Sequence, residues 1–414
     1  MPEFQPVRGT HDLLPEEFRR HRHVVDTARA VAERYGFAEI ATPIFEFTEV
    51  FARSMGETSD VVSKEMYSFV DKGGDALTLR PEYTAGICRA FISNGLSQAV
   101  PLKLFAHGPM FRFERPQKGR QRQFHQIDVE VIGAPEPAAD VEVIAVAADI
   151  LAALGILDRC TLELNSLGDG ESRQSYRTAL VAYLEQHRAR LSEDSLRRLE
   201  RNPLRVLDSK DPGDREVVAG APLLAEHFNA ATAEFFASVR AGLDALGVPY
   251  TVSPRLVRGL DYYTHTAFEF VTHALGAQGT VLAGGRYDGL IEQLGGPPTA
   301  GIGWAGGIER LAMLGSDPPP ARRPVALVPI GAVAENTALS LAQTLRRSGL
   351  IVELAYKGNV GRRLKRADKL NAAVAVLLGD NELARGMAMV KDLDNGTQEE
   401  VPLDRLPERV AHLR

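Results

Sequence analysis

The sequence predicts an α+β fold: a mainly antiparallel sheet with flanking helices, followed by a separate, smaller α/β domain. Three observations predict it. Two apolar arms, residues 102–113 and 124–132, flank a long polar loop, as in an antiparallel hairpin. Residues 170–235 have a charged, helical pattern that indicates a helical insertion. The proline-rich, polar stretch 316–324 is typical of a linker, and strand and helix patterns alternate after it.

The remaining elements follow in chain order. Residues 16–36 place apolar side chains at helical spacing and end at Gly36, a typical helix stop. Residues 37–47 are extended but contain Pro43, which suits an edge strand or a bend. Strand patterns resume at Tyr250, and residues 300–315 have the pattern of a strand or turn leading into a helix. Beyond the linker we expect alternating strands and helices at 325–331, 332–348, 351–356, 360–370 and 372–379.

We therefore expect a first domain over residues 1–318, with its helical insertion at about 168–240, and a second domain over residues 324–414.

Composition excludes several classes of protein. The apolar share of 44% and the charged share of 25% are those of an ordinary globular chain, and no run of 18 apolar residues would span a membrane. The N-terminus shows no secretory signal. Cys88 and Cys160 lie far apart without a CxxC or Cys/His cluster, so we expect the reducing cytoplasm and no disulfide framework or structural zinc. A net charge of −6 means that any nucleic acid would have to bind local basic patches.

The sequence GIGWAG, residues 301–306, matches the G-x-G-x-x-G dinucleotide fingerprint. No strand pattern precedes it, and the helix after it runs into the proline-rich linker instead of a second strand. We therefore interpret these glycines as positions of close packing. No GxxxxGK[ST] motif occurs, which excludes a P-loop nucleotide site.

Several arginines stand where a cation is costly. Arg112 lies in the first hairpin arm on the face of Met110, where it needs either an anionic ligand or an internal salt bridge with Glu82, Glu114 or Glu130. Arg310 lies in the first turn of a helix, whose dipole favours an anion there. The hairpin loop adds cations that could bind a polyphosphate or an RNA backbone: Arg115, Lys118, Arg120 and Arg122.

Two stretches place polar groups in a strand pattern. Gln126, Asp128 and Glu130 alternate with apolar residues and predict a polar strand face. The stretch LVRGLDYYTHTAFEF, residues 256–270, also alternates like a strand, with Arg258 and Tyr262 at the same parity.

The chain resembles the class II aminoacyl-tRNA synthetases. Their three signature motifs are similar to the helix 16–36 with the segment up to Pro43, to FRFERPQKGRQRQFHQ (residues 111–126), and to GIGWAGGIERL (residues 301–311). Residues 256–270 and AGGRYDGL, residues 283–290, resemble two signatures peculiar to histidyl-tRNA synthetases, and RGTHDLLP resembles their N-terminal signature. The resemblance covers nearly the whole chain.

The resemblance implies a fold, a reaction and partners. The fold would be an antiparallel sheet of six to seven strands, with a C-terminal α/β anticodon-binding domain. The reaction would join L-histidine to histidine tRNA through a histidyl-adenylate, with ATP as substrate and Mg2+ bound with it. The protein would be a cytoplasmic homodimer without a membrane anchor.

The resemblance also implies roles for individual residues, each at a position that matches a family motif. The catalytic cations would be Arg258 and Arg112. ATP would be bound by Arg112, Glu114, Arg120 and Arg310. The tRNA acceptor stem would meet Arg115, Gln117, Lys118 and Arg122. Histidine would be bound by Glu82, Tyr83, Thr84, Arg112, Gln126, Glu130, Arg258, Tyr262, Tyr263 and Tyr287.

In that scheme Glu130 and Tyr263 grip the imidazole, and Asp261 is a structural partner. No cluster of protein ligands for a metal is expected. Tyr83 departs from the family pattern, which commonly has glycine there. In the last domain a basic segment would bind RNA through six cations: Lys357, Arg362, Arg363, Lys365, Arg366 and Lys369.

Two alternatives stay open. A regulatory subunit of ATP phosphoribosyltransferase shares the catalytic fold, but those paralogues lack the C-terminal domain and lose the arginines that this chain keeps. Another class II synthetase, such as a glycyl or prolyl enzyme, would lack the signature at residues 258–263.

Overall fold

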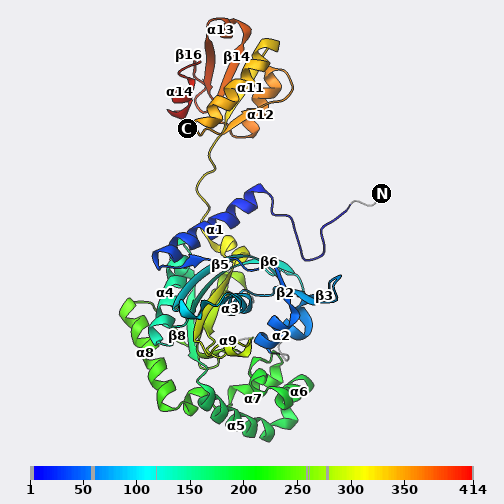
Figure 1. Cartoon of the computed structure of the whole chain (residues 1–414), viewed down its shortest axis with the longest axis vertical. Helices are drawn as coiled ribbons and strands as arrows, with labels where there is room; N and C mark the ends of the chain where they lie inside the picture. Colours follow the sequence, from blue (N-terminus) through cyan, green and yellow to red (C-terminus); the bar gives the residue numbers. More distant parts are fainter. Residues whose placement is uncertain are drawn as a thin grey trace. The chain divides into compact units, whose positions relative to one another are not determined.

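The computed structural model describes residues 4–56, 61–117, 119–257, 260, 262–276 and 279–412. The chain divides into two compact units, Met1–Pro318 and Pro319–Arg414, each drawn in Figure 1. Over the described ranges, no helix is both long and apolar enough to cross a membrane.

The centre of the first unit is a sheet to which the described residues contribute eight strands (Figure 1). The end pairs β1–β5 and β7–β8 are parallel, and the pairs between them are antiparallel. In sheet order the strands are β1 (Ala38–Glu39), β5 (Leu102–Phe111), β6 (Gln123–Ile132), β11 (Gly301–Gly307), β10 (Thr280–Arg286), β9 (Thr264–Val271), β7 (Thr161–Ser166) and β8 (Thr251–Val252). The mainly antiparallel fold and the edge strand before Pro43 are confirmed, whereas six to seven strands was too few.

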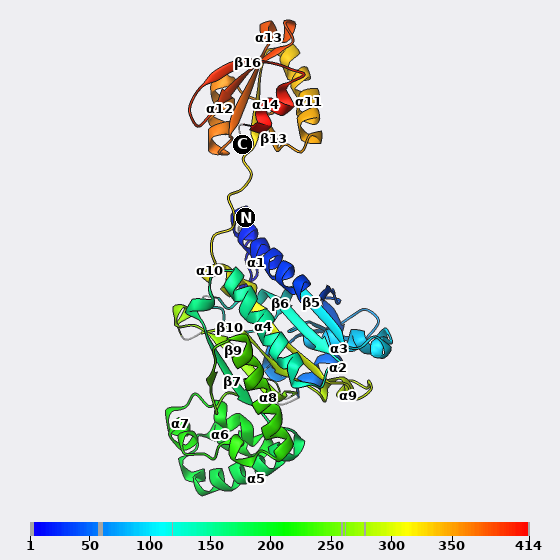
Figure 2. The ribbon, with the colours of Figure 1, turned by 90° about the vertical axis from the view of Figure 1, so that its left-hand side faces the viewer.

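Four helices cover one face of this sheet (Figure 2): α1 (Pro15–Arg34), α4 (Pro137–Ala153), α8 (Ala230–Leu246) and α10 (Ile308–Leu314). Ile127, Val129 and Val131 of β6 are buried in the core on this side. The opposite face packs against α2 (Thr48–Met55), α3 (Thr84–Ser93) and α9 (Leu290–Gln293). Because side chains alternate along a strand, the polar positions of β6 face α3.

The predicted hairpin is confirmed as β5–β6, in which Leu102 is opposite Ile132 and Phe111 is opposite Gln123. The first helix is also confirmed. Pro15 occupies its first turn, and Gly36 follows its end with a φ of 81°, a left-handed conformation that suits glycine.

A small three-stranded sheet was not predicted. It consists of β2 (Phe45–Phe47), β4 (Ala76–Leu79) and β3 (Tyr67–Val70), in that order. Strands of three or four residues are too short to show a clear alternation in sequence.

The helical pattern over residues 170–235 is confirmed. It contains α5 (Gly170–Gln186), α6 (Glu193–Arg201), α7 (Pro212–Ala219) and the start of α8, and α5, α6 and α7 share an apolar core of their own. Single helical turns, of the 3-10 or π type, complete the first unit: Val61–Glu65, Leu96–Gln98, Leu157–Arg159, Arg188–Arg190, Pro203–Asp208, Leu224–His227 and His273–Leu275.

The second unit is a five-stranded sheet with helices, in the strand order β13-β12-β14-β15-β16. The predicted alternation is confirmed by β12 (Val325–Ile330), α11 (Ala332–Arg347), β13 (Val352–Leu354), α12 (Val360–Lys369) and β14 (Val374–Gly379), whose strands are parallel. The antiparallel strands beyond them were not predicted. The remaining elements are α13 (Asp380–Ala384), β15 (Met387–Asp392), β16 (Gln398–Pro402) and α14 (Leu406–His412).

Candidate active site

A cavity of about 330 Å³ opens beside the polar positions of β6. Its lining combines the hairpin loop, the strands β6, β10 and β11, the start of α10 and the segment before β9. Predicted site residues in this lining are Glu82, Thr84, Arg112, Glu114, Arg120, Gln126, Tyr262, Tyr263 and Arg310.

Three predicted cations, Arg112, Arg120 and Arg310, meet at this cavity. Burial lowers the pKa of the Arg310 guanidinium, and the neighbouring charges of Arg120 and Arg112 lower it further. Its Nη1 donates to the carbonyl of Thr280 at 2.5 Å, which fixes the side chain. Like charges gathered in a partly buried place favour an anionic ligand, because only an anion relieves their repulsion.

Arg112 lies one residue beyond the end of β5, and its backbone N–H donates to the carbonyl of Arg122 on the opposite side of the hairpin at 2.9 Å, so its position in the first hairpin arm is confirmed. Its Nε donates to the carbonyl of Pro81 at 2.9 Å, and its guanidinium stands 5.4 Å from the ring centre of Phe124. Among the described residues it forms no ion pair. Glu114, one of the three predicted partners, instead contacts Arg120 at 2.5 Å. The internal salt bridge is therefore not formed, and Arg112 keeps its charge available for a ligand.

The predicted polar face of β6 is confirmed: Gln126, Asp128 and Glu130 are each at most 9% exposed. Gln126 lies in the cavity wall, and its Oε1 accepts no hydrogen bond within the described part of the chain. A buried acceptor without a donor is costly. A ligand with an N–H or ammonium group would satisfy it.

Glu130 lies beneath the cavity rather than in its lining. The hydroxyls of Thr84 and Tyr287 each donate to one of its carboxyl oxygens at 2.5 Å. Burial raises the pKa of Glu130 to about 8, although these two hydrogen bonds oppose the shift. Tyr287, also predicted to contact histidine, is 1% exposed and does not line the cavity. It is linked to the cavity wall by its hydrogen bond to Glu130, which in turn accepts from Thr84.

The glycines of GIGWAG have the structural role that was predicted. They lie in β11, an antiparallel strand, so no dinucleotide fold forms around them. A Cβ at Gly303 would lie 1.7 Å from Oε2 of Glu130, and one at Gly301 would lie 2.1 Å from the ring of Tyr287. Only glycine leaves room here for these two side chains.

Glu82 and Thr84 also line the cavity. The Glu82 carboxylate accepts from the backbone N–H of Ala85 at 2.8 Å and from the Tyr262 hydroxyl at 3.2 Å. Burial raises the pKa of Glu82, although the Ala85 N–H and the Arg112 charge act in the opposite direction.

Tyr83 points away from the cavity. Its hydroxyl donates to the carbonyl of His107 at 2.6 Å, and Arg80 stacks on its ring at 4.2 Å. Its backbone has ordinary helical angles, φ −91° and ψ −37°, so no glycine is needed at this position. Space comes instead from Gly108 on β5, where a Cβ would lie 2.7 Å from the Tyr83 hydroxyl.

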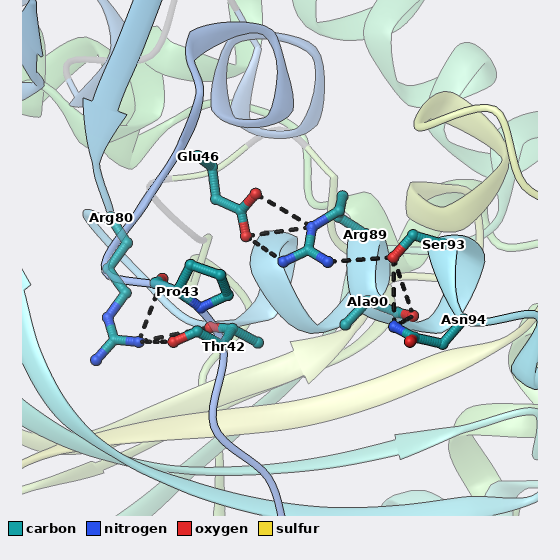
Figure 3. A network of polar contacts seen from close by, with 8 residues as sticks. All are labelled: Thr42, Pro43, Glu46, Arg80, Arg89, Ala90, Ser93 and Asn94. Atoms are coloured by element: carbon teal, nitrogen blue, oxygen red, sulfur yellow. Dashed lines mark hydrogen bonds and ion pairs between the residues drawn. The ribbon is translucent and has the colours of Figure 1, made fainter. Parts of the chain in front are cut away.

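Figure 3 shows the polar contacts of Arg80 and Arg89, two arginines that are close in sequence to Glu82 and Thr84. On one side Arg80 donates to the carbonyl of Thr42 at 2.8 Å. On the other, Arg89 of α3 forms an ion pair with Glu46 of β2. Both arginines hold this wall of the cavity in place from outside it.

β9 begins only at Thr264, so the described residues just before it, Leu260, Tyr262 and Tyr263, are not in a strand as predicted. Arg258 and Asp261 lie outside the described residues. Tyr262 and Tyr263 both line the cavity, and their ring centres are 4.5 Å apart. Strand alternation alone would have placed them on opposite faces, whereas the resemblance placed both in the histidine pocket. The parity shared by Arg258 and Tyr262 stays a prediction. Arg173 of the helical insertion donates to the Tyr263 carbonyl at 2.8 Å.

The predicted tRNA-binding residues of the hairpin loop differ in their exposure and in their contacts. Arg115 and Gln117 are exposed, and Lys118 lies outside the described residues. Arg122 stacks on Phe113 at 3.8 Å, and its backbone N–H donates to the carbonyl of Gly9 at 2.8 Å. Arg122 therefore helps to hold the N-terminal segment.

Two carboxylates in the cavity lining were missed. Glu269 of β9 accepts from Thr280 at 2.9 Å, and Glu309 of α10 accepts from the backbone N–H of His125 at 2.9 Å. The lone acid in the apolar strand TAFEF was the available signal for Glu269.

Two family models match the chain. One, described as histidyl-tRNA synthetase, covers residues 9–311, and the other, described as anticodon binding domain, covers residues 324–413.

Known proteins resemble the chain over its full length. The histidine–tRNA ligase of Rhodospirillum rubrum is 64% identical over 412 residues, 99% of each chain. That of Gluconacetobacter diazotrophicus is 60% identical over 413 residues, 100% of each chain. Among solved structures, the apo histidyl-tRNA synthetase of S. aureus is 36% identical and has a TM-score of 0.83, covering 98% of this chain and 99% of that one.

Proposed function

This chain belongs to the histidyl-tRNA synthetase family, and we propose that it attaches L-histidine to histidine tRNA with ATP, through a histidyl-adenylate. The observation that carries the proposal is the group of three arginines around a cavity that also contains the unpartnered acceptor of Gln126. The cations suit a triphosphate, and the acceptor suits the ammonium group of an amino acid.

In the first step a carboxylate oxygen of histidine attacks the α-phosphorus of ATP. The bond from that phosphorus to the pyrophosphate oxygen breaks as the new one forms. Negative charge builds on the phosphate oxygens, so cations already in place lower the barrier. We assign Arg112 and Arg258 to the α-phosphate, and Arg120 and Arg310 to the β- and γ-phosphates.

Histidine recognition follows from the polar wall. Glu82, Thr84 and Gln126 are assigned to the α-amino and carboxylate groups. A neutral imidazole offers one donor and one acceptor nitrogen, which a carboxyl and a hydroxyl match. We assign this pair to Glu130 and Tyr263. Side chains that leave these buried groups unpaired are rejected.

In the second step the 3′-terminal ribose hydroxyl of the tRNA attacks the carbonyl carbon of the adenylate, and AMP leaves. The exposed Arg115 and Gln117 are on the hairpin loop, where the acceptor end would bind.

The second unit would bind the anticodon. In α12, Arg363 and Arg366 form ion pairs with Glu335 and Glu353, so the predicted set of six free cations was too large. The remaining four cations form no ion pair within the described residues: Lys357, Arg362, Lys365 and Lys369. Tyr356, beside them, is 91% exposed and offers a ring on which a base can stack.

Mg2+ is proposed to enter with ATP. Glu114 and Glu269 both line the cavity, and Oε2 of Glu114 lies 2.5 Å from Nε of Arg120. Carboxylate oxygens of this kind suit Mg2+, which would offset phosphate charge. These two residues would hold the ion together with the phosphates.

We also propose a cytoplasmic homodimer. The apolar stripe of α1 is buried in the chain's own core, so it does not support an interface between subunits. The small sheet supports one instead, because it exposes Phe45, Phe47, Phe69 and Val70. Sedimentation analysis would measure the oligomeric state.

ATP–pyrophosphate exchange with each amino acid in turn tests the function. We expect exchange with histidine alone. Exchange with glycine or proline would favour another class II synthetase. No exchange with any amino acid would favour the regulatory-subunit alternative. The full-length matches to histidine–tRNA ligases support that alternative less than the synthetase.

A further inference from the structure

Three potential metal ligands from distant parts of the sequence meet beside the active-site cavity, whose lining includes one of them, Glu309. They are His21 of α1, His125 of β6 and Glu309 of α10, and one ligand atom of each lies within 4.8 Å of the others. His125 Nδ1 and Glu309 Oε1 are 2.9 Å apart. The rings of His21 and His125 meet edge to face, with their centres 5.5 Å apart.

A second cavity, of about 350 Å³, adjoins this cluster, and both His21 and Glu309 line it. His11 and Glu17 line the same cavity and contact each other at 3.0 Å. Its lining also includes Arg20, which forms an ion pair with Asp317 at 2.8 Å, so its charge is compensated. The cluster thus has open space on one side and further imidazole and carboxylate groups around that space.

We propose that His21, His125 and Glu309 bind a divalent transition-metal ion, with Zn2+ the best match. Two imidazoles and one carboxylate are a common ligand set for zinc, and the adjoining cavity leaves room for water in the fourth position. Mg2+ does not suit the site because it prefers oxygen ligands.

The protein already orients these ligands. The backbone N–H of His125 donates to both Glu309 oxygens, at 2.9 and 3.1 Å, which holds the carboxylate beside the imidazole. The ion would take the place of the hydrogen between His125 Nδ1 and Glu309, and the neutral imidazole would then carry its ring proton on Nε2. Metal binding would tie α1 to β6 and α10.

The site is tested with the untagged, full-length protein after chelator treatment and dialysis. Zn2+ is titrated by calorimetry, and Co2+ by its visible d–d absorption. We expect one ion per chain and a rise in the thermal unfolding midpoint with Zn2+. His21→Ala should weaken binding by on the order of 100-fold or more, since even the loss of a residue that only orients a ligand costs 10–100-fold.

His23→Ala is the matched control, because His23 is on the same helix and does not belong to the cluster. It should bind like the unaltered protein. His21→Gln, checked by circular dichroism, covers the case in which the alanine variant does not fold. The proposal is overturned if the unaltered protein binds no stoichiometric Zn2+, or if a folded His21 variant binds it equally well. In either case the His125–Glu309 contact is only a structural hydrogen bond.

Discussion

Glu130 is a carboxyl group held by two hydroxyls in an interior that excludes water. Thr84 and Tyr287 each donate to it at 2.5 Å, yet burial raises its pKa to about 8. Below that pH the group is largely neutral in the free protein. Because the imidazole N–H needs an acceptor, ionisation of Glu130 would strengthen its assigned role in binding histidine.

Replacing Glu130 with glutamine gives a stability prediction with a definite sign. Between pH values of about 4.5 and 8 the folded protein holds a proton at Glu130 that the unfolded chain has lost. The free energy of unfolding of the unaltered protein should therefore fall with rising pH in this window and level off above it. Glutamine cannot ionise, so the stability of Glu130→Gln relative to the unaltered protein should rise with pH over the same window.

Chemical denaturation at a series of pH values measures this difference. The change in hydrogen bonding to Thr84 and Tyr287 adds an offset that does not depend on pH, so the slope isolates the ionisation. A constant difference from pH 5 to 8 would show that Glu130 titrates near its ordinary value.

Arg258 gives the sharpest prediction for catalysis. If it neutralises charge on the α-phosphate, Arg258→Ala should slow histidine-dependent pyrophosphate exchange by about 100-fold or more, the cost of losing one such donor. Arg258→Lys should recover only part of the rate, because an ammonium lacks the planar fork of guanidinium. Near-normal exchange in the alanine variant would falsify the assignment.

Residue-scale expectations from the sequence depended on regular alternation. Alternation placed Gln126 and Glu130 on one face because β6 is a regular strand. It could not describe Tyr262 and Tyr263, which lie before the start of β9 and both line the cavity. It could not show that Tyr83 turns away from the cavity, since that depends on space left by Gly108 in another strand.

At the scale of elements, helix α5 of the insertion touches the active-site wall directly. Arg173 donates to the Tyr263 carbonyl at 2.8 Å, although Tyr263 follows it in the chain by 90 residues. We infer that α5 positions the tyrosine pair. The sequence predicted the helix but not this contact, because nothing in its periodicity identifies a partner so far away.

Arg173→Ala should therefore raise the KM for histidine roughly tenfold, the effect of losing one hydrogen bond from a charged donor. The kcat should change less, because Arg173 does not line the phosphate-binding cavity. Arg177→Ala is the control, since Arg177 is exposed on the same helix. Steady-state pyrophosphate exchange separates KM from kcat. Equal effects of both variants would contradict a positioning role.

At the scale of the whole molecule, the sequence predicted the larger elements and missed the shortest. The β5–β6 hairpin and the alternation from β12 to β14 are long enough to show a period. The strands β2, β4 and β3 are too short for this, and β2 pairs with β4 across more than twenty residues of chain. Such pairing depends on tertiary packing, which local pattern does not specify.

The two units each bury a core of their own, and this gives a prediction for the chain as a whole. A truncated protein of residues 1–320 keeps the cavity and its arginines, so histidine-dependent pyrophosphate exchange should stay within a few-fold of that of the full chain. Charging of histidine tRNA should fall steeply, because Tyr356 and the four cations beside it, which are proposed to bind the tRNA, are lost. In the full chain, Tyr356→Ala should weaken tRNA binding by about 1–3 kcal/mol if a base stacks there. Binding to both full-length forms should weaken with salt. Undiminished charging by the truncated protein would show that the second unit does not bind the tRNA.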